Sequence, residues 1–401
     1  MKKILVYYGY SQKNAGDMAI CFGLLDLLEE IPDCNITMVS RYSKKDPLFF
    51  ESKKIIEQYH PSVVVKPGYI SFDRSKGIFS KIKSYISGWF ISTFSCFSRH
   101  LKNDIKDKDL VLFNGGNYLR CNSLTDKMRL KALLFPIKYA KKHGKTVICM
   151  PQSTAKAANK SSLSRIKKLC TNFDHIFIRD PISYKYFLEN HVCEENKLSQ
   201  SCDLAFFTKK LSNEFPNIDK LDSFKRAVSI NLRLTGIGDI GTISKDKVEL
   251  VHKTFTKLIS ENNDTLFTFV CQTEKDYIPM ENLYKKLAAQ GQKNIAFLKS
   301  NDAYYLKNVY SLHDALISMR LHASILSISV GTPVIGFAFE EWGFKNTGIL
   351  NQFGFNNYLD FSSIEKEIKT VDKSKVKDSI QTMILNHKNK LLSELNRYLK
   401  M

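Results

Sequence analysis

The chain has 401 residues, of which 43 % are hydrophobic and 25 % are charged, and this composition excludes a wholly disordered chain, a collagen-like chain and a small disulfide scaffold. Sixty Lys and Arg residues against forty Asp and Glu residues give a formal net charge of +20. Such a charge attracts polyanions or an anionic membrane surface, although a lysine-rich solvated surface gives the same count. The length alone predicts two or three domains.

The nine cysteines include no pair with CxxC spacing. This pattern argues against a disulfide framework or a cysteine zinc site and favours a reducing compartment. Residues 1–8 have the pattern of a first β-strand rather than of a signal peptide, and no run of 18 apolar residues predicts a transmembrane helix. We therefore expect a cytoplasmic protein with no bound metal.

Strands and helices alternate through residues 1–212. Apolar runs predict strands at 3–8, 36–39, 62–65, 110–113, 146–150 and 175–178. Helical spacing of apolar residues predicts helices at 18–28, 127–142, 162–169 and 182–189. This order is typical of a parallel sheet with helices on both faces.

The alternation stops at a polar linker, 213–223, and then starts again. Strands are predicted at 227–232, 266–271, 295–297, 315–318 and 333–337, and helices at 245–260, 280–290 and 321–329. The sequence thus predicts two doubly wound, Rossmann-like α/β domains, 1–212 and 224–362, followed by a charged helical tail, 363–401. Two such domains face each other across a cleft in the GT-B-like architecture, and the cleft holds the active site.

Residues 66–108 form a basic insertion in the first domain. It has nine basic side chains against three acidic ones, and it encloses an aromatic run at 85–97 that is too short to span a bilayer. Basic flanks around aromatic residues suit a segment that lies on an anionic membrane surface, peripherally on the inner face of the plasma membrane. The alternative is a core helix with a solvated lysine face. No nucleic-acid-binding module is recognisable.

Polar residues follow the predicted strands. Asn14, Gly16 and Asp17 stand between the first strand and the first helix, where Gly16 permits close approach of a ligand and a helix N-terminus favours an anion. Asp17 could equally cap that helix. Neither a GxGxxG fingerprint nor a P-loop is present.

Two further loops follow buried strands. Gly115, Gly116 and Asn117 form a close-approach loop or a turn that needs a positive φ, and Gln152 and Ser153 can hydrogen-bond sugar hydroxyls or phosphate. Together with Arg233 and the residues at 14, 16 and 17, they are our candidate acceptor-binding set.

Arginine also stands at strand ends. The guanidinium of Arg179 suits bidentate binding of a carboxylate or a phosphate, and Asp180 is placed to cap the next helix. Arg320 and His322 lie where a strand ends and a helix begins, so an arginine, a histidine and a helix N-terminus converge there. Such a group can hold an anion and move a proton near pH 7. Lys345 could add a third cation.

The ordered motifs together resemble the polysaccharide pyruvyl transferase family over residues 1–355. The matching residues are Asn14-x-Gly16-Asp17, Gly115-Gly116, Gln152-Ser153, Arg179-Asp180, Cys202-Asp203 and Arg320-Leu321-His322-Ala323. Two features depart from the family pattern. Asn114 replaces the first of three glycines, and the aromatic-x-x-Lys segment is spread out from Phe339 to Lys345.

The resemblance implies a GT-B-like fold and the transfer of pyruvate from phosphoenolpyruvate to two hydroxyls of a sugar in bacterial surface-polysaccharide synthesis. It implies phosphoenolpyruvate binding by Arg179, Arg320 and Leu321, acid/base catalysis by His322, and no cofactor. The acceptor sugar could be linked to polyprenyl diphosphate or to a nucleotide.

Two other functions remain open from the sequence. One is a nucleotide-sugar-dependent GT-B glycosyltransferase, in which Arg320 and Lys345 would bind a diphosphate. The other is a non-catalytic anion- or membrane-binding protein, which leaves the polar residues at the strand ends unexplained.

Overall fold

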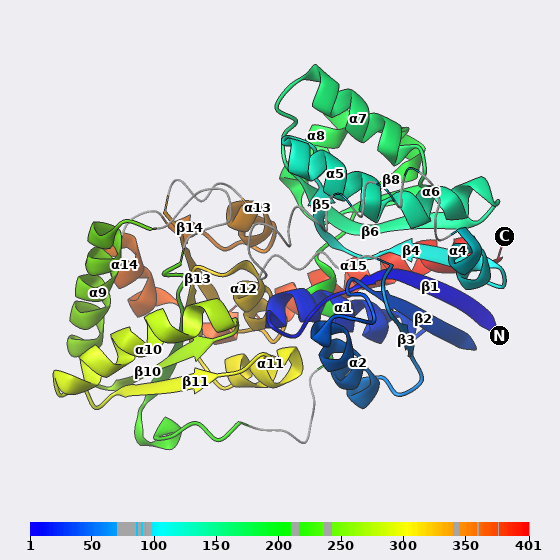
Figure 1. Ribbon diagram of the computed structural model, residues 1–401. Coiled ribbons are helices and arrows are strands. Elements are labelled where there is room, and N and C mark those ends of the chain that lie inside the picture. Colours follow the sequence, from blue (N-terminus) through cyan, green and yellow to red (C-terminus); the bar gives the residue numbers. More distant parts are fainter. Residues whose placement is uncertain are drawn as a thin grey trace. The chain divides into compact units, whose positions relative to one another are not determined.

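A computed structural model describes residues 1–69, 86, 90, 93, 98–209, 216–235, 243–339, 345–358, 361–375 and 377–400. The chain divides into two compact units (Figure 1). Unit 1 consists of Met1–Gln12, Ile20–Leu204 and His387–Met401, and unit 2 consists of Lys13–Ala19 and Ala205–Asn386.

This division differs from the predicted boundaries at both ends of the chain. Residues 13–19 belong to unit 2 because the Ala15 N–H donates a hydrogen bond of 3.1 Å to the Gln272 carbonyl. Residues 387–401 belong to unit 1, where the Tyr398 hydroxyl donates to the Asp174 carbonyl at 3.3 Å. Contacts that are distant in sequence therefore assign both segments.

The sheet of unit 1 has strand order β3-β2-β1-β4-β6-β7-β8, and β5 pairs with β6. Every described pairing in it is parallel. The strands are β1 (Lys2–Gly9), β2 (Cys34–Ser40), β3 (Val64–Lys66), β4 (Leu110–Phe113), β5 (Gly116–Leu119), β6 (Thr146–Thr154), β7 (His175–Ile178) and β8 (Leu198–Gln200). The helices are α1 (Ala15–Leu28), α2 (Pro47–Tyr59), α4 (Ser98–Ile105), α5 (Leu124–Leu133), α6 (Phe135–Lys142), α7 (Lys160–Cys170) and α8 (Pro181–Glu189).

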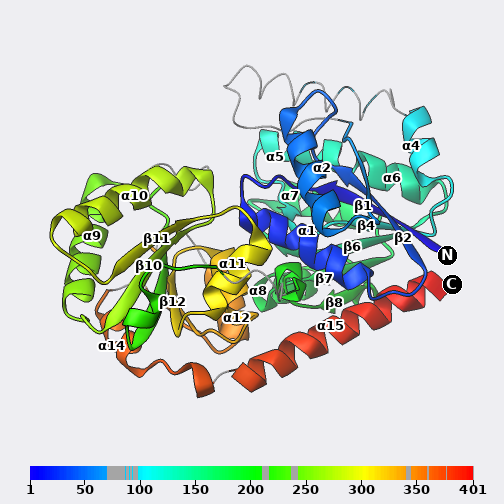
Figure 2. The ribbon, with the colours of Figure 1, turned by 90° about the horizontal axis from the view of Figure 1, so that it is seen from below.

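The sheet of unit 2 has strand order β11-β10-β9-β12-β13-β14, and it is also parallel (Figure 2). Its strands are β9 (Arg226–Asn231), β10 (Thr265–Cys271), β11 (Ile295–Lys299), β12 (Ala315–Ser318), β13 (Val334–Phe337) and β14 (Asn357–Tyr358). Its helices are α9 (Lys245–Ser260), α10 (Glu274–Ala289), α11 (Ala303–Ser311), α12 (Leu321–Ile328), α13 (Lys345–Gln352) and α14 (Phe361–Thr370), and α15 (Lys377–Lys400) begins in this unit.

Burial on both faces explains why these strands are apolar runs rather than alternating ones. All residues of β4, β7, β10, β12 and β13 are buried. In unit 2 the core combines strand residues such as Ile230 and Phe269 with Phe255 of α9 and Leu283 of α10. The predicted fold class, doubly wound parallel α/β in both halves, is confirmed.

Several elements differ from the sequence predictions. The helix predicted over 127–142 is two helices, α5 and α6, separated at Leu134 just before Pro136, whose ring cannot continue a helix interior. Helix α2 was not predicted, although Asp46 caps it by accepting from the Leu48 N–H at 3.1 Å. Most of the basic aromatic insertion, 70–85 and most of 86–97, lies outside the described residues. Its expected membrane contact stays a prediction.

Candidate active site

The site of unit 2 is set by its strand order. Strands β9 and β12 are neighbours in the sheet, although β10 and β11 come between them in sequence. The crossovers therefore change direction at this point, and parallel α/β sheets generally bind their ligands beyond the carboxyl ends of two such strands. Arg233 follows β9, and Arg320 and His322 follow β12.

Arg320 is anchored by a buried carboxylate. Its guanidinium forms an ion pair with Asp276, which is 1 % exposed. Asp276 also accepts hydrogen bonds from Thr273 Oγ1 at 2.9 Å and from Thr235 Oγ1 at 3.3 Å. The backbone of Arg320 is held as well, because its N–H donates to Ser318 Oγ at 3.0 Å. Arg320, the N-cap residue of α12, is thus held both at its backbone and at its guanidinium.

A second guanidinium lies in the same electrostatic environment. The pKa of the half-buried Arg233 falls to about 10, first because burial penalises its charge and then because of the charge of Arg320. Asp276 opposes this shift. Both guanidiniums therefore lie near one buried carboxylate, and guanidiniums at such a position favour an anion as ligand.

Helix α1 begins against this cluster. Asn14 forms an isolated antiparallel bridge with Thr273, and its side-chain Oδ1 accepts from the Gly16 N–H at 3.1 Å. A Cβ on Gly16 would lie 2.5 Å from Nδ1 and 2.6 Å from Cβ of His322. Only glycine allows the first turn of α1 to pack this closely on the histidine, so Gly16 helps to define the position of its imidazole.

These contacts change two expectations for the N-terminal motif. Helix α1 starts at Ala15, so Asp17 lies inside the first turn, and the capping oxygen comes from Asn14 rather than from Asp17. Asn14, Gly16 and Asp17 also belong to unit 2, whereas the other predicted acceptor loops, at Gly116 and Gln152, belong to unit 1.

In unit 1 the glycine loop follows β4, which neighbours β1 at the corresponding switch of strand order. Gly116 has φ +142°, and a Cβ there would lie 2.4 Å from the Tyr10 hydroxyl. That hydroxyl donates to the Gly115 carbonyl at 2.8 Å. Gln152 is fully buried, donates to the Asn114 carbonyl at 2.6 Å and accepts from the Tyr118 N–H at 3.0 Å. These bonds hold the loop in one conformation.

Arg179 lies in a second network of unit 1 and is 3 % exposed. Its Nε donates to Ser153 Oγ at 2.7 Å, and its Nη1 pairs with the buried Asp203. Asp180 accepts from the Ser183 N–H at 2.7 Å as the cap of α8, which confirms its predicted role. Ser153 and Asp203 hold the Arg179 guanidinium in place, and its binding of phosphoenolpyruvate stays a prediction, as does binding of the acceptor by Ser153.

The remaining candidates are placed more loosely. Leu321 begins α12 and Asn117 lies in β5, and both are partly exposed. Lys345 begins α13, but its side chain lies outside the described residues. Sequence reasoning missed Asp276, Thr273 and Thr235, because an acidic residue in the first turn of a helix such as α10 is an ordinary feature.

Unit 1 also holds a pocket of about 650 Å³ beyond the carboxyl ends of β2 and β3. Lys44, Lys45 and Lys66 line it, and Asp104 on its wall accepts from Lys66 Nζ at 2.8 Å and from the Tyr69 hydroxyl. The sequence analysis did not single out these residues beyond their positive charge.

No helix among the described residues is long and apolar enough to cross a membrane.

Comparison with solved structures shows the fold. A putative UDP-N-acetylglucosamine 2-epimerase from Listeria monocytogenes matches with a TM-score of 0.63 at 12 % identity, covering 100 % of this chain and 97 % of that one. A glycosyltransferase from Rickettsia africae matches with a TM-score of 0.60 at 13 % sequence identity, and the match covers 100 % of this chain and 98 % of that one. The S. aureus MnaA–UDP complex matches with a TM-score of 0.58 at 13 % sequence identity, and the match covers 100 % of this chain and 97 % of that one. These likenesses confirm two parallel-sheet α/β domains of the GT-B type.

Sequence relatives were also sought. No curated protein matches the chain. The model of the polysaccharide pyruvyl transferase family matches residues 14–341, beginning at the Asn14 that bridges to Thr273 and extending past the Arg-Leu-His motif. The chain therefore belongs to the polysaccharide pyruvyl transferase family and is a transferase.

Proposed function

We propose that this protein transfers pyruvate from phosphoenolpyruvate to two hydroxyls of one sugar, forming a cyclic ketal in the synthesis of a bacterial surface polysaccharide. Family membership supports pyruvate transfer in polysaccharide synthesis. The observation that carries the choice of donor is the pair of guanidiniums, Arg233 and Arg320, that share the single carboxylate of Asp276. Phosphoenolpyruvate, a small acid with a carboxylate and a phosphate, is a suitable ligand for two such guanidiniums.

The donor carries both a carboxylate and a phosphate. Planar guanidiniums bind either group through paired N–H donors, and each charge-assisted hydrogen bond contributes about 1.5–3 kcal/mol. Asp276 and Ser318 fix Arg320 before the donor arrives, so little side-chain entropy is lost on binding. Arg320 and Arg233 therefore serve donor affinity in this proposal.

His322 acts as the proton donor. It protonates the methylene carbon of phosphoenolpyruvate, which leaves an oxocarbenium-like centre at the carbon that bears the phosphate. One sugar hydroxyl attacks that centre and returns a proton to His322, and the phosphate then leaves with its bonding electron pair. A neighbouring hydroxyl attacks the new oxocarbenium-like centre and closes the ketal, and its proton goes to the departing phosphate. General acid/base catalysis of this kind contributes roughly 10²–10⁴-fold to the rate. No cofactor besides the co-substrate takes part in this scheme.

The acceptor is proposed to contact the start of α1. Asp17 is partly exposed in the first turn, and Asn14 lies directly before that turn. A carboxylate and an amide are suitable partners for sugar hydroxyls. The carrier of this sugar is either polyprenyl diphosphate or a nucleotide, and an anionic membrane surface is a proposed partner in the first case.

Phosphate release from phosphoenolpyruvate, measured over a panel of polyprenyl-linked and nucleotide-linked sugars, tests the proposal. We expect release by the wild type with one class of acceptor. In His322→Ala the release should fall by about 10²-fold or more while phosphoenolpyruvate still binds. His252→Ala is the matched control, a half-buried histidine on α9 of the same unit. Wild-type turnover in His322→Ala would remove the histidine from this role, and no release with any acceptor would overturn the proposed function.

The glycosyltransferase alternative makes a different prediction. The UDP in some of the similar structures belongs to those proteins and establishes only that this fold can hold a nucleotide. If the alternative holds, a UDP-sugar is consumed and phosphoenolpyruvate is not, so the same assay separates the two functions.

A further inference from the structure

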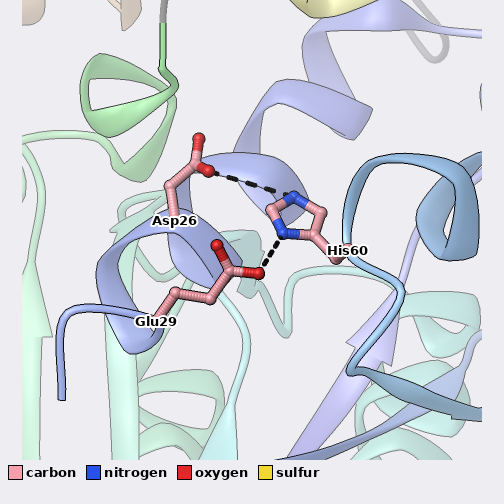
Figure 3. Close-up of side chains that lie close together, drawn as sticks. All are labelled: Asp26, Glu29 and His60. Atoms are coloured by element: carbon pink, nitrogen blue, oxygen red, sulfur yellow. Dashed lines mark hydrogen bonds and ion pairs between the residues drawn. The ribbon is translucent and has the colours of Figure 1, made fainter. Parts of the chain in front are cut away.

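We propose that Asp26, Glu29 and His60 of unit 1 form a binding site for one divalent transition-metal ion of the zinc type. This site lies outside the donor and acceptor residues discussed above, and the inference does not depend on the proposed function. Figure 3 shows the three side chains pointing toward one another.

The fold brings these residues together from two helix ends. Asp26 lies in the last turn of α1, and Glu29 follows that helix directly, so the two acids, three positions apart, share one helix face. His60 is the C-cap of α2, and its backbone N–H donates to the Ile56 carbonyl at 2.8 Å. The backbone around each donor is therefore fixed independently of the side chains.

The distances suit a bound cation after small side-chain movements. Glu29 Oε1 lies 2.7 Å from Nδ1 of His60, and Asp26 Oδ1 lies 4.0 Å from its Nε2. One donor atom from each residue lies within 4.8 Å of the others. With bonds of about 2.0–2.2 Å, the ligands of a tetrahedral zinc are about 3.3–3.6 Å apart. Side-chain rotation can close this difference, so the ion would take one imidazole nitrogen and one oxygen from each acid, with water as the fourth ligand.

Burial makes the charge of this cluster expensive without a counterion. Asp26 and His60 are only 2 % and 1 % exposed, and the ring of Phe22 on the same face of α1 lies 5.7 Å from the imidazole. A histidine that binds zinc is neutral, so in the bound state the two carboxylates balance the charge of the divalent cation. The Glu29 side chain is 27 % exposed, and this side gives an ion its entry.

The donor set also selects the metal. One imidazole nitrogen and two carboxylates suit zinc, whereas magnesium prefers six oxygen ligands and keeps several waters. An ion held here would tie the C-terminal end of α1 to the C-terminal end of α2. Without a metal, the same cluster is held by the hydrogen bond between Glu29 and His60, and the experiment must separate these two states.

Calorimetric titration of the chelator-treated full-length protein with Zn²⁺ tests the site, and Co²⁺ absorption reports the ligand geometry. We expect the wild type to bind one equivalent more than His60→Gln, and Glu29→Gln to lose at least about tenfold in affinity. His143→Gln, an exposed histidine outside the cluster, should bind as the wild type does. Zinc should also raise the thermal midpoint of the wild type, and millimolar Mg²⁺ should not compete.

The partly buried thiols of Cys34 and Cys193 are present in the wild type and in every variant. Any zinc that they bind therefore cancels when the zinc bound by a variant is subtracted from that bound by the wild type. Glu29→Gln changes a partly exposed side chain and keeps its shape, so it remains informative if His60→Gln does not fold. Equal zinc affinity and stoichiometry in the wild type and Glu29→Gln would overturn the proposal and leave the cluster without a metal. Neither result bears on phosphate release, so failure of this site and failure of the proposed function are distinguishable.

Discussion

At Gly16, the addition of a single methyl group should have a large effect on turnover. In Gly16→Ala the new methyl would lie within 2.7 Å of the His322 side chain, so the imidazole must move. A displacement of about 1 Å at a catalytic group costs about 10²-fold in rate. We expect that loss in phosphate release together with a lower denaturation midpoint, because the new methyl would also lie 2.6 Å from the His322 Cβ, which cannot move without the backbone of α12. Normal turnover in this variant would show that the close packing does not position His322.

Asp276 should affect both stability and donor binding, because its carboxylate lies near the charges of Arg320 and Arg233. Asp276→Asn keeps the shape but removes the charge, and losing the ion pair with Arg320 should lower the free energy of unfolding by about 1.5–3 kcal/mol. Phosphoenolpyruvate then supplies the missing countercharge. Its stabilising thermal shift should therefore be larger in the variant than in the wild type. An equal or smaller shift would contradict the electrostatic account of the site.

Sequence reasoning placed Arg320 and His322 correctly at a strand–helix junction, because the end of an apolar strand is visible in the sequence. It could not assign Asp276 as the partner of Arg320, since that contact joins residues 44 positions apart. Arg179 shows the same limit. Its guanidinium was predicted at a strand end, where it lies, but its pairing with Asp203 depends on the packing of β7 against β8.

Strand β12 is preceded by a buried histidine that should make unit 2 sensitive to acid. Burial, the largest cause, and the charge of Lys373 together lower the pKa of His313 to about 4, while the hydrogen bond to the Val309 carbonyl and the charge of Asp314 oppose the shift. The unfolded chain, with an ordinary histidine pKa near 6.5, therefore binds more protons between pH 6.5 and pH 4. Stability is full above pH 6.5 and is lost as the pH falls through that window.

Urea denaturation at pH 6.5 and pH 5 measures this contribution. The wild type should lose about 2 kcal/mol more than His313→Gln over this interval, since one pKa unit corresponds to 1.36 kcal/mol. The glutamine amide can replace the Nδ1 hydrogen bond to the Val309 carbonyl, which is 2.8 Å long. The same loss in both proteins would mean that other groups cause the acid sensitivity.

Most of the predicted elements were correct because their cause is local. The strand over 110–113 and the helix over 245–260 have the predicted bounds, since each is a clear apolar run or helical period. Helix α2 was missed because Phe50 and Ile55 stand directly beside the buried Phe49 and Ile56, and these adjacent apolar residues blur its helical spacing. With α2 unrecognised, His60 could not be placed beside Asp26 and Glu29 from the sequence.

For the whole molecule, the repeat of strand and helix was enough to predict two parallel α/β domains of the GT-B type. The division into units was less accessible, because residues 13–19 and 387–401 are assigned by contacts with distant parts of the chain. The predicted site in a cleft between the domains stays a prediction. What the described residues establish is the cluster around Arg320 inside unit 2.

The most direct test of the central claim is calorimetric binding of phosphoenolpyruvate in the absence of acceptor. We expect the wild type and His322→Ala to bind it with similar affinity and Arg320→Ala to bind at least about tenfold more weakly, the loss of one charge-assisted hydrogen bond. We expect no binding of a UDP-sugar to the wild type or to either variant. Unchanged phosphoenolpyruvate affinity in Arg320→Ala, or tight binding of the UDP-sugar that depends on Arg320, would contradict the account.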